Sequence, residues 1–388
     1  MKITRLTGTE CNLTRNLWES VFQEDSRKFV DYYYEQKAKD NIAYVTGEEP
    51  YEAMLFRTPY PVQIQDKLKE LSYLVGVATR EEYRHNGRMT ALLMTAMQEM
   101  YKERLPFTFL MPADPAIYDP FDFSYIYERP QWNFQNPDFP IKELEPLIGT
   151  RNRWLPEGEE ANGTARLKAA EKGQGKELKA AAVTEESGKE PCSLQLTGYE
   201  LSSLTGRCVD HGEEAHRLYQ RLADYANHWL EQRHRIYVKR DCRYYERQLA
   251  ELQAQNGDIF LLEREGELEG FFLYAREGQE IAVQEMMETV PGSFWFIEEK
   301  EEKKPIIMAR IIHLEEMMKL VKSSQNRAVL IDVEDPILPQ NEGRYLWEIT
   351  PFGSRVSRQK EVRGAEVYMT IKELTPYLIQ GAFLNEIV

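Results

Sequence analysis

The sequence predicts a mixed α+β fold built from more than one domain. The chain has 388 residues, which exceeds the size at which a single hydrophobic core usually stops growing. Hydrophobic residues make up 42% of the chain and charged residues 29%, proportions typical of a globular protein. Segments with helical periodicity alternate with segments typical of strands. We therefore expect helices packed on mixed sheets in two or three domains.

The composition also restricts the function. The first ten residues, MKITRLTGTE, lack the apolar run of a signal peptide, and no apolar stretch is long enough for a membrane helix. The net charge of -15 disfavours nucleic acid as a partner. It suits a cationic small molecule or a basic peptide, or it serves only to keep the surface solvated. We expect a cytoplasmic protein.

No metal site is expected. The six histidines and four cysteines show no spacing typical of metal ligands. The cysteines are scattered and are interpreted as ordinary buried or surface thiols: Cys11, Cys192, Cys208 and Cys242.

The first domain is predicted at residues 1–150. Its expected elements are helices near 17–22 and 29–34, strands at 42–46 and 51–56, a loop containing prolines, a strand at 71–79, a helix at 88–102 and a strand at 107–111. The helix at 88–102 has an apolar face with the spacing of a buried helix, formed by Leu92, Leu93, Ala96, Met97 and Met100.

Three further segments are predicted. Residues 151–195 are rich in Ala, Glu, Lys and Gly and are expected to be a flexible insertion, because they cannot bury enough apolar surface. Residues 196–300 repeat the element order of the first domain. Residues 301–388 form a last α+β domain. Expected helices lie at 214–232, 242–253, 312–321 and 371–380, and expected strands at 258–263, 268–276, 280–286, 328–333, 344–350, 353–357 and 366–370.

The strongest chemical signal lies where a buried strand leads through a loop into a helix. The strand ends at Val77, Ala78 and Thr79, and the helix starts soon afterwards. Such a loop can direct backbone N–H groups and the positive end of the helix dipole at an anion. The spacing is neither that of a Walker loop nor that of a GxGxxG turn. We predict a cofactor pyrophosphate site that includes Arg84, His85, Asn86, Gly87, Arg88, Met89 and Thr90. The alternative for the arginines is a solvated helix start.

This segment resembles the coenzyme A loop of the GNAT acetyltransferase superfamily, written R/Q-x-x-G-x-G/A. The chain has Arg84-x-x-Gly87-x-Met89, so the last small residue is missing. The segment from Leu110 to Phe123 resembles the strand and Tyr-x-x-x-Gly-Phe turn of the same superfamily, with Asp122 where glycine is usual.

The closer resemblance is to the enhanced intracellular survival (Eis) family of acetyltransferases, and it covers the whole chain. In that family apolar residues follow the R-x-x-G loop. The segment Pro112-Ala-Asp-Pro-Ala-Ile-Tyr118 is similar to its P-S/A-E-x-x-I-Y motif, which adds Ala113 and Asp114 to the expected cofactor site. The resemblance implies acetyl-CoA as co-substrate, a second GNAT-like domain without a coenzyme A loop, a sterol-carrier-protein-like third domain and a homohexamer.

The resemblance also implies two catalytic groups, Tyr118 as general acid and the carboxylate of Val388 as general base. A tyrosine hydroxyl, with a pKa of about 10, can donate to a thiolate whose conjugate acid has a pKa near 8.5. The alternatives are that Tyr118 only packs in the core and that Val388 ends a frayed terminus. Against fraying, the tail contains large apolar residues, among them Phe383, Leu384 and Ile387.

The expected activity is acetyl transfer to primary amines of a cationic small molecule, such as an aminoglycoside or a polyamine, or to a lysine side chain. A different class remains open, a lipid- or ligand-binding protein whose GNAT domain is inactive. The intact loop residues and Tyr118 favour the enzyme.

Overall fold

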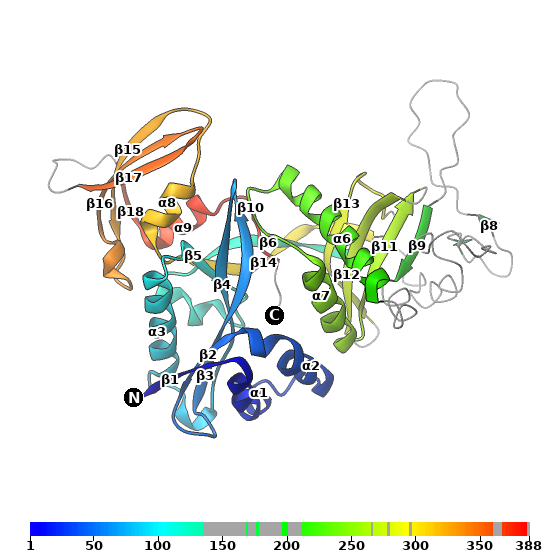
Figure 1. Ribbon diagram of the computed structural model, residues 1–388, viewed down its shortest axis with the longest axis horizontal. Helices are drawn as coiled ribbons and strands as arrows, with labels where there is room; N and C mark the ends of the chain where they lie inside the picture. The colour runs from blue at the N-terminus through cyan, green and yellow to red at the C-terminus, as the bar shows by residue number, and fades with distance from the viewer. Residues whose placement is uncertain are drawn as a thin grey trace. The chain divides into compact units, whose positions relative to one another are not determined.

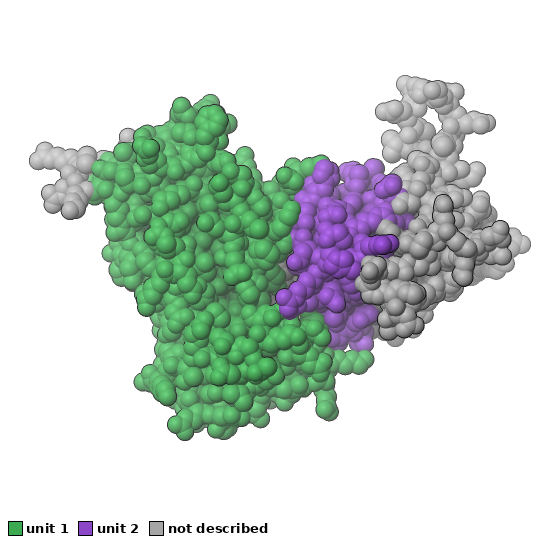
Figure 2. Space-filling model, in the orientation of Figure 1, with its two compact units in different colours: residues 1–129, 230–239, 303–388 green, residues 130–229, 240–302 purple. Residues whose placement is uncertain are grey.

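The structure is a computed structural model that describes residues 1–134, 168–169, 176–177, 196–200, 212–264, 267–277, 280–294, 297–359 and 367–385. The chain divides into two compact units (Figure 2). Unit 1 consists of residues 1–129, 230–239 and 303–388, and unit 2 of residues 130–229 and 240–302. Within the described ranges, no helix is long and apolar enough to cross a membrane.

The largest sheet has the order β1-β2-β3-β4-β5-β14-β6 (Figure 1). In addition, β10 pairs with β3, and β19 pairs with β10. Its strands are β1 (Ile3–Thr7), β2 (Ile42–Thr46), β3 (Ala53–Ile64), β4 (Lys67–Thr79), β5 (Phe107–Leu110), β6 (Ser124–Phe134), β10 (Ile236–Val238), β14 (Ile297–Ile311) and β19 (Ala382–Phe383). Three helices accompany it: α1 (Arg15–Val21), α2 (Arg27–Tyr32) and α3 (Arg88–Lys102).

Two smaller sheets have four strands each. One has the order β13-β12-β11-β9 and includes β9 (Leu196–Glu200), β11 (Asp258–Arg264), β12 (Glu267–Glu277) and β13 (Glu280–Glu288), with helices α6 (Gly212–Arg233) and α7 (Cys242–Ala254). The other has the order β17-β16-β15-β18 and includes β15 (Arg327–Glu334), β16 (Gly343–Thr350), β17 (Gly353–Gln359) and β18 (Val367–Thr370), with helices α8 (Leu314–Leu320) and α9 (Ile371–Leu378).

These sheets and helices confirm the predicted mixed α+β class and most of the predicted elements. The predicted insertion at 151–195 lies outside the described residues apart from β7 (Lys168–Ala169) and β8 (Lys176–Glu177). Residues of the predicted first and last domains fall together in unit 1. The functional division into four segments stays a prediction.

Helix α3 shows why its periodicity was informative. All five residues of the predicted apolar face have no exposed surface, and they join one hydrophobic cluster with Tyr44, Leu55 and Leu110. The helix begins after Gly87, whose φ of 73° is left-handed. Glycine adopts that conformation without steric cost.

The predicted proline-containing loop after Phe56 is wrong, because this segment is the second half of β3. Pro59 and Pro61 pair in register with β4. The Pro61 carbonyl accepts a hydrogen bond from the Lys239 N–H at 2.7 Å, so the Pro61 nitrogen also faces away from β4. Pro59 lies two residues earlier and faces the same side. Neither missing N–H therefore interrupts the β3–β4 ladder, which is the condition under which strands accept proline.

Strand β4 bulges near its end. Met54 pairs with Ala78 while Phe56 pairs with Val75, so two residues of β4, Gly76 and Val77, lie opposite one residue of β3. An extra residue of this kind bends a strand and redirects its end. Gly76 has a φ of 59°, a conformation that costs other residues about 1–2 kcal/mol.

Strand β14 was not anticipated, and it carries sequence-distant residues into the first sheet. Met308 to Ile311 pair antiparallel with Phe107 to Leu110 of β5. The preceding residues of β14, from Glu298 to Pro305, are exposed. Because most of these residues are charged, this part of the sequence lacks the apolar pattern of a strand.

We expect Gly76→Ala to lower the free energy of unfolding by about 2–5 kcal/mol, from left-handed strain and overpacking together. A Cβ at Gly76 would lie 2.6 Å from Cζ3 of Trp18 and 3.0 Å from Cδ2 of Phe56. Gly8 also has a φ of 59°, but a Cβ there would meet nothing within 4 Å. Gly8→Ala is thus a control for strain alone, with an expected loss of about 1–2 kcal/mol. Urea denaturation measures both, and equal losses would contradict the packing argument.

Candidate functional site

The end of β4 has an open edge. β4 pairs with β5 in parallel at Ser72–Thr108 and Tyr73–Phe109. From Leu74 to Thr79, β4 has no strand partner on that side among the described residues. Its backbone N–H and C=O groups can therefore bind an extended ligand as a further strand would. The predicted residues Val77, Ala78 and Thr79 lie on this edge.

The loop between β4 and α3 ends in a helix start with free N–H groups. The first donor inside α3 is the Ala91 N–H, which bonds to the Gly87 carbonyl at 3.0 Å. The N–H groups of Arg88, Met89 and Thr90 have no acceptor among the described residues, and Gly87 supplies no side-chain cap. Unsatisfied N–H groups at a helix start form an anion site.

The side chains of the predicted loop are mostly exposed. This holds for Arg84, His85, Asn86 and Thr90, while Met89 is half-buried. Nε of Arg84 donates to the Thr79 carbonyl at 3.3 Å, which folds the loop back on the strand. His85 has a φ of 60°, a conformation uncommon outside glycine. A Cβ placed on Gly87 would meet nothing within 4 Å, so the space above this residue is open to a ligand.

Arg88 already has an acidic partner. Its Nε lies 2.6 Å from Oε2 of Glu52, and this hydrogen bond lowers the pKa of the Glu52 carboxyl. The guanidinium also stacks on the ring of Tyr83, 4.6 Å from its centroid. The free N–H groups are therefore better placed for an anion than the Arg88 charge.

Tyr118 lies between two short 3-10 turns that follow β5, at Pro115–Ile117 and Asp119–Phe121. Ala113 and Asp114 are exposed, and the Asp114 side chain caps the first turn by accepting from the Ala116 N–H at 2.9 Å. The second turn ends at Asp122, whose φ of 59° is left-handed. This explains why glycine is usual at the position, and aspartate is one of the residues that tolerate it.

The Tyr118 side chain is 6% exposed and packs edge-on against Phe123, with ring centroids 5.8 Å apart. Burial raises the pKa of Tyr118 to about 12. The cluster that holds it also contains Val77 from the open edge and Met89 from the helix start. The fold thus brings the three predicted parts of the site onto one apolar core.

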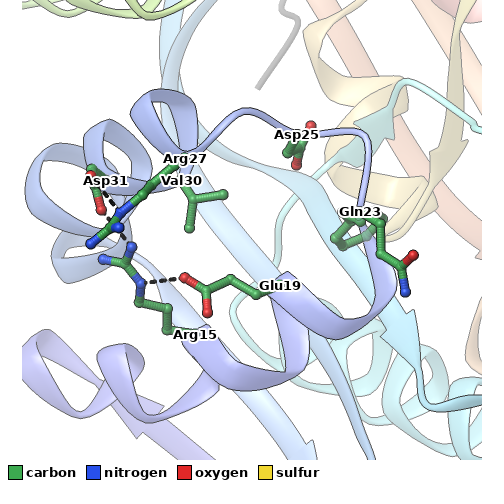
Figure 3. A pocket seen from close by; sticks show the side chains of 8 residues that line it. Arg15, Glu19, Gln23, Asp25, Arg27, Val30 and Asp31 are labelled. Carbon is green, nitrogen blue, oxygen red and sulfur yellow. Dashed lines mark hydrogen bonds and ion pairs between the residues drawn. The ribbon is translucent and has the colours of Figure 1, made fainter.

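A hollow with a volume of about 610 Å³ lies between α1 and α2. Figure 3 shows Arg15 there between Glu19 and Asp31, at 2.8 and 2.5 Å. Asp25 also lines the hollow, and burial raises the pKa of its carboxyl. Three carboxylates and two guanidinium groups line it: Glu19, Asp25, Asp31, Arg15 and Arg27.

Val388 lies outside the described residues, so its predicted role stays a prediction. The segment shortly before Val388 is held in the first sheet by strand pairing. β19 pairs in parallel with β10, and β10 pairs with β3. Phe383 is 8% exposed and Leu384 is fully buried, as the apolar character of the tail suggested.

No group of three or more potential metal ligands occurs in the part of the chain that the structure describes. Cys11 and Cys242 are free thiols, while Cys192 and Cys208 lie outside the described residues.

Comparison with known proteins bears on this geometry. The family model described as acetyltransferase (GNAT) domain matches residues 2–126, which cover β1 to the start of β6. These residues form a GNAT acetyltransferase domain. No curated protein sequence matches the chain.

The fold of the whole chain, GNAT domain included, recurs in solved structures of low sequence identity. A probable N-acyltransferase from Enterococcus faecalis V583 is 14% identical with a TM-score of 0.63, over 97% of this chain and 88% of its own. A GCN5-related N-acetyltransferase from Anabaena variabilis is 14% identical with a TM-score of 0.61, over 97% and 89%. Eis1 from Mycobacterium abscessus is 10% identical with a TM-score of 0.60, over 98% and 90%.

Two residues near the site were not predicted from the sequence, Arg310 and Asp335. Arg310 of β14 donates from Nε to the Phe121 carbonyl at 2.7 Å, and Asp335 accepts from its Nη2 at 2.5 Å. A signal existed, because Arg310 is a single charge within the apolar run from Ile306 to Ile312. A charge inside a buried strand needs a partner, but the sequence does not reveal which one.

We expect Gly87→Val in the GNAT domain to weaken coenzyme A binding by about tenfold or more, a loss of about 1.4 kcal/mol or more. A β-branched residue at a positive φ distorts the helix start, and its side chain fills the open space. Titration calorimetry on the folded variant measures the affinity. Gly292→Val is the control, because Gly292 has a φ of 85° and equally open surroundings in unit 2. Unchanged affinity in Gly87→Val would contradict the loop assignment.

Proposed function

We propose that the protein is an acetyl-CoA-dependent N-acetyltransferase acting on primary amines of a cationic small molecule or of a lysine side chain. One observation carries the proposal. The open edge of β4, the unsatisfied start of α3 and Tyr118 surround one hydrophobic cluster in the GNAT domain.

The residues present fit coenzyme A. Its pyrophosphate is an anion, for which the N–H groups of Arg88, Met89 and Thr90 are available. Its pantetheine arm carries amide groups in an extended chain, and these can pair with the open backbone from Leu74 to Thr79. The apolar side chains Val77 and Met89 adjoin this path and pack against the hydrophobic cluster.

Tyr118 is proposed as the general acid. Acetyl transfer forms a bond between the amine nitrogen and the acetyl carbon and breaks the bond from that carbon to sulfur. The leaving thiolate then needs a proton, and the amine must lose one. Because its pKa is about 12, Tyr118 is protonated at neutral pH and able to donate. Its hydroxyl has no hydrogen-bond partner within the described ranges, so it is available to a ligand.

The base that accepts the amine proton is proposed, from family resemblance alone, to be the carboxylate of Val388. The sterol-carrier-like third domain and the homohexamer have the same basis, while the cytoplasmic location is expected from the composition. All four remain predictions.

A cationic acceptor is supported by charge. The chain carries a net charge of -15, and the hollow between α1 and α2 has one more carboxylate than it has guanidinium groups. An amine with several positive charges would enter such a surface with favourable electrostatic energy.

A coenzyme A release assay tests the function. Purified protein with acetyl-CoA is offered polyamines, aminoglycosides and lysine peptides, and mass spectrometry reads the acetylated product. We expect transfer to at least one cationic class and none to a neutral alcohol of similar size. Tight acetyl-CoA binding without transfer to any amine would instead favour a binding protein.

We expect Tyr118→Phe to lower kcat by about 10²–10⁴, the usual contribution of a positioned acid, while the affinity for coenzyme A stays unchanged. Steady-state kinetics and calorimetry separate the two quantities. Tyr33→Phe is the control, since Tyr33 is likewise a buried tyrosine but lies outside the cluster of Tyr118. Turnover close to wild type in Tyr118→Phe, with chemistry rate-limiting, would assign this side chain to packing.

The pH dependence gives a separate prediction. Burial favours the neutral form of Tyr118 and places its pKa near 12, so the proton-donating form persists below that pH. We expect no fall in kcat between pH 7 and about 10, whereas a tyrosine with the ordinary pKa of about 10 would already be half ionised at the upper limit. A fall of about tenfold per pH unit starting near pH 8, in a stably folded enzyme, would exclude Tyr118 as the acid.

A further inference from the structure

Tyr118 sits in a segment that local structure alone holds weakly. The two turns beside it are three residues each, and such short 3-10 turns have poor hydrogen-bond geometry. The Tyr118 carbonyl accepts from the Phe121 N–H at 3.0 Å and from the Phe123 N–H at 3.4 Å. The segment of Tyr118 therefore needs a contact from outside the two turns to hold Phe121 in place.

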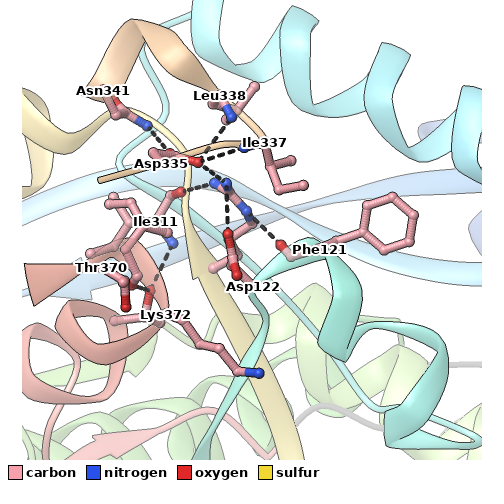
Figure 4. Close-up of polar contacts among 12 residues, drawn as sticks. Phe121, Asp122, Ile311, Asp335, Ile337, Leu338, Asn341, Thr370 and Lys372 are labelled. Carbon is pink, nitrogen blue, oxygen red and sulfur yellow. Dashed lines mark hydrogen bonds and ion pairs between the residues drawn. The ribbon is translucent and has the colours of Figure 1, made fainter. Parts of the chain in front are cut away.

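Arg310 supplies that contact. Its Nε donates to the Phe121 carbonyl at 2.7 Å, and its Nη1 donates to the Ile311 carbonyl at 2.7 Å. The Asp122 carboxylate lies 4.0 Å from Nη2. β14 pairs Arg310 with Thr108 of β5, which fixes its position along the strand. In Figure 4, Phe121, Asp122, Ile311 and Asp335 lie around the point where these contacts meet.

The charge of Arg310 is balanced by Asp335, directly after β15. Nη2 lies 2.5 Å from Oδ1 of Asp335, and both side chains have no exposed surface. Oδ1 also accepts from the N–H groups of Ile337 and Leu338 at 3.2 and 2.9 Å, and Oδ2 accepts from Asn341 at 2.9 Å. Leu338 packs in the cluster of Tyr118.

A buried ion pair is poorly explained by stability alone. Removing two charges from water costs several kcal/mol for each ion, and well-packed neutral replacements are often as stable. An arginine can instead bond in several fixed directions at once. Here Arg310 bonds to the turn of Tyr118, to the backbone of β14 and to the segment that follows β15.

We propose that the buried Arg310–Asp335 pair is a positioning device that holds the Tyr118 hydroxyl in place for proton donation. Through this pair, the segment that follows β15 contributes to the active site, although neither residue touches substrate. This inference rests on the proposed acetyltransferase function of the same site.

The test replaces the pair by neutral residues of similar shape, Arg310→Met with Asp335→Asn. The amide oxygen that the second change introduces can still accept from the two backbone N–H groups, although its amide nitrogen cannot accept the bond from Asn341. Because both partners are neutralised together, neither charge of the pair is left buried alone. We expect kcat to fall about 100-fold, the effect of misplacing a catalytic group by about 1 Å, while the affinity for coenzyme A stays unchanged. Arg310→Lys is a second variant, since it keeps the charge but has no Nε donor for Phe121, and it should lower kcat likewise.

The control is the equally buried pair of unit 2, changed by Arg240→Met with Glu285→Gln. Its guanidinium lies 2.6 Å from the carboxylate, with both side chains at most 3% exposed. We expect this variant to keep the kcat of the wild type. A general effect of removing buried charge would lower both.

A double-mutant cycle with Tyr118→Phe gives the decisive result. If the pair acts through Tyr118, neutralising it should lower kcat in the wild-type background but not further in Tyr118→Phe. Equal losses in both backgrounds, or no loss in either, would overturn the proposal.

Amide hydrogen exchange separates this inference from the proposed function. Exchange at Phe121 and Phe123 should speed up in the neutral-pair variant and not in the control, whether or not acetyl transfer is observed. Inactive wild-type protein would overturn the proposed function. Unchanged exchange at these amides would overturn the positioning role in any case.

Discussion

Strand β14 enters the first sheet beside β5, through Met308 to Ile311 against Phe107 to Leu110, and the geometry of the site depends on this ladder. β5 meets β4 through only two residue pairs, so its other side must be covered for the strand to stay in place. The ladder covers that side and leaves the end of β4 open. It also fixes Arg310 beside the turn of Tyr118. A strand contributed from much later in the chain thus completes the sheet of the GNAT domain.

The site divides its tasks between backbone and side chains. In the proposed site, anion binding is assigned to N–H groups at the start of α3, because the nearby Arg88 is already paired with Glu52. Backbone groups of β4 offer extended pairing next to the apolar cluster. Burial keeps Tyr118 neutral by raising its pKa. A site of this kind would bind its proposed cofactor through fixed dipoles, which need little reorganisation when charge develops.

The sequence predicted the features that depend on residues close together in the chain. The apolar face of α3 has helical spacing, and all five of its residues are buried. The strand-loop-helix spacing placed the open edge and the helix start together. Asp122, noted as a departure from glycine, has the left-handed φ that the turn requires.

What the sequence did not reveal depends on contacts between distant residues. Pro59 and Pro61 suggested a loop, since proline lacks the N–H of a strand ladder. Only the pairing on each side of β3 shows that the missing N–H groups would face away from β4. β14 was hidden by the charges of its exposed half. The partner of Arg310 lies 25 residues further along, and no spacing rule connects them.

The most direct test of the central claim is amide hydrogen exchange of the full chain with and without saturating acetyl-CoA. The account predicts protection at the end of β4 and at the start of α3, in peptides covering Leu74 to Thr90. It predicts no change in β11 to β13 of unit 2. Protection confined to unit 2, or none at any amide despite saturation, would contradict the assignment of the cofactor site.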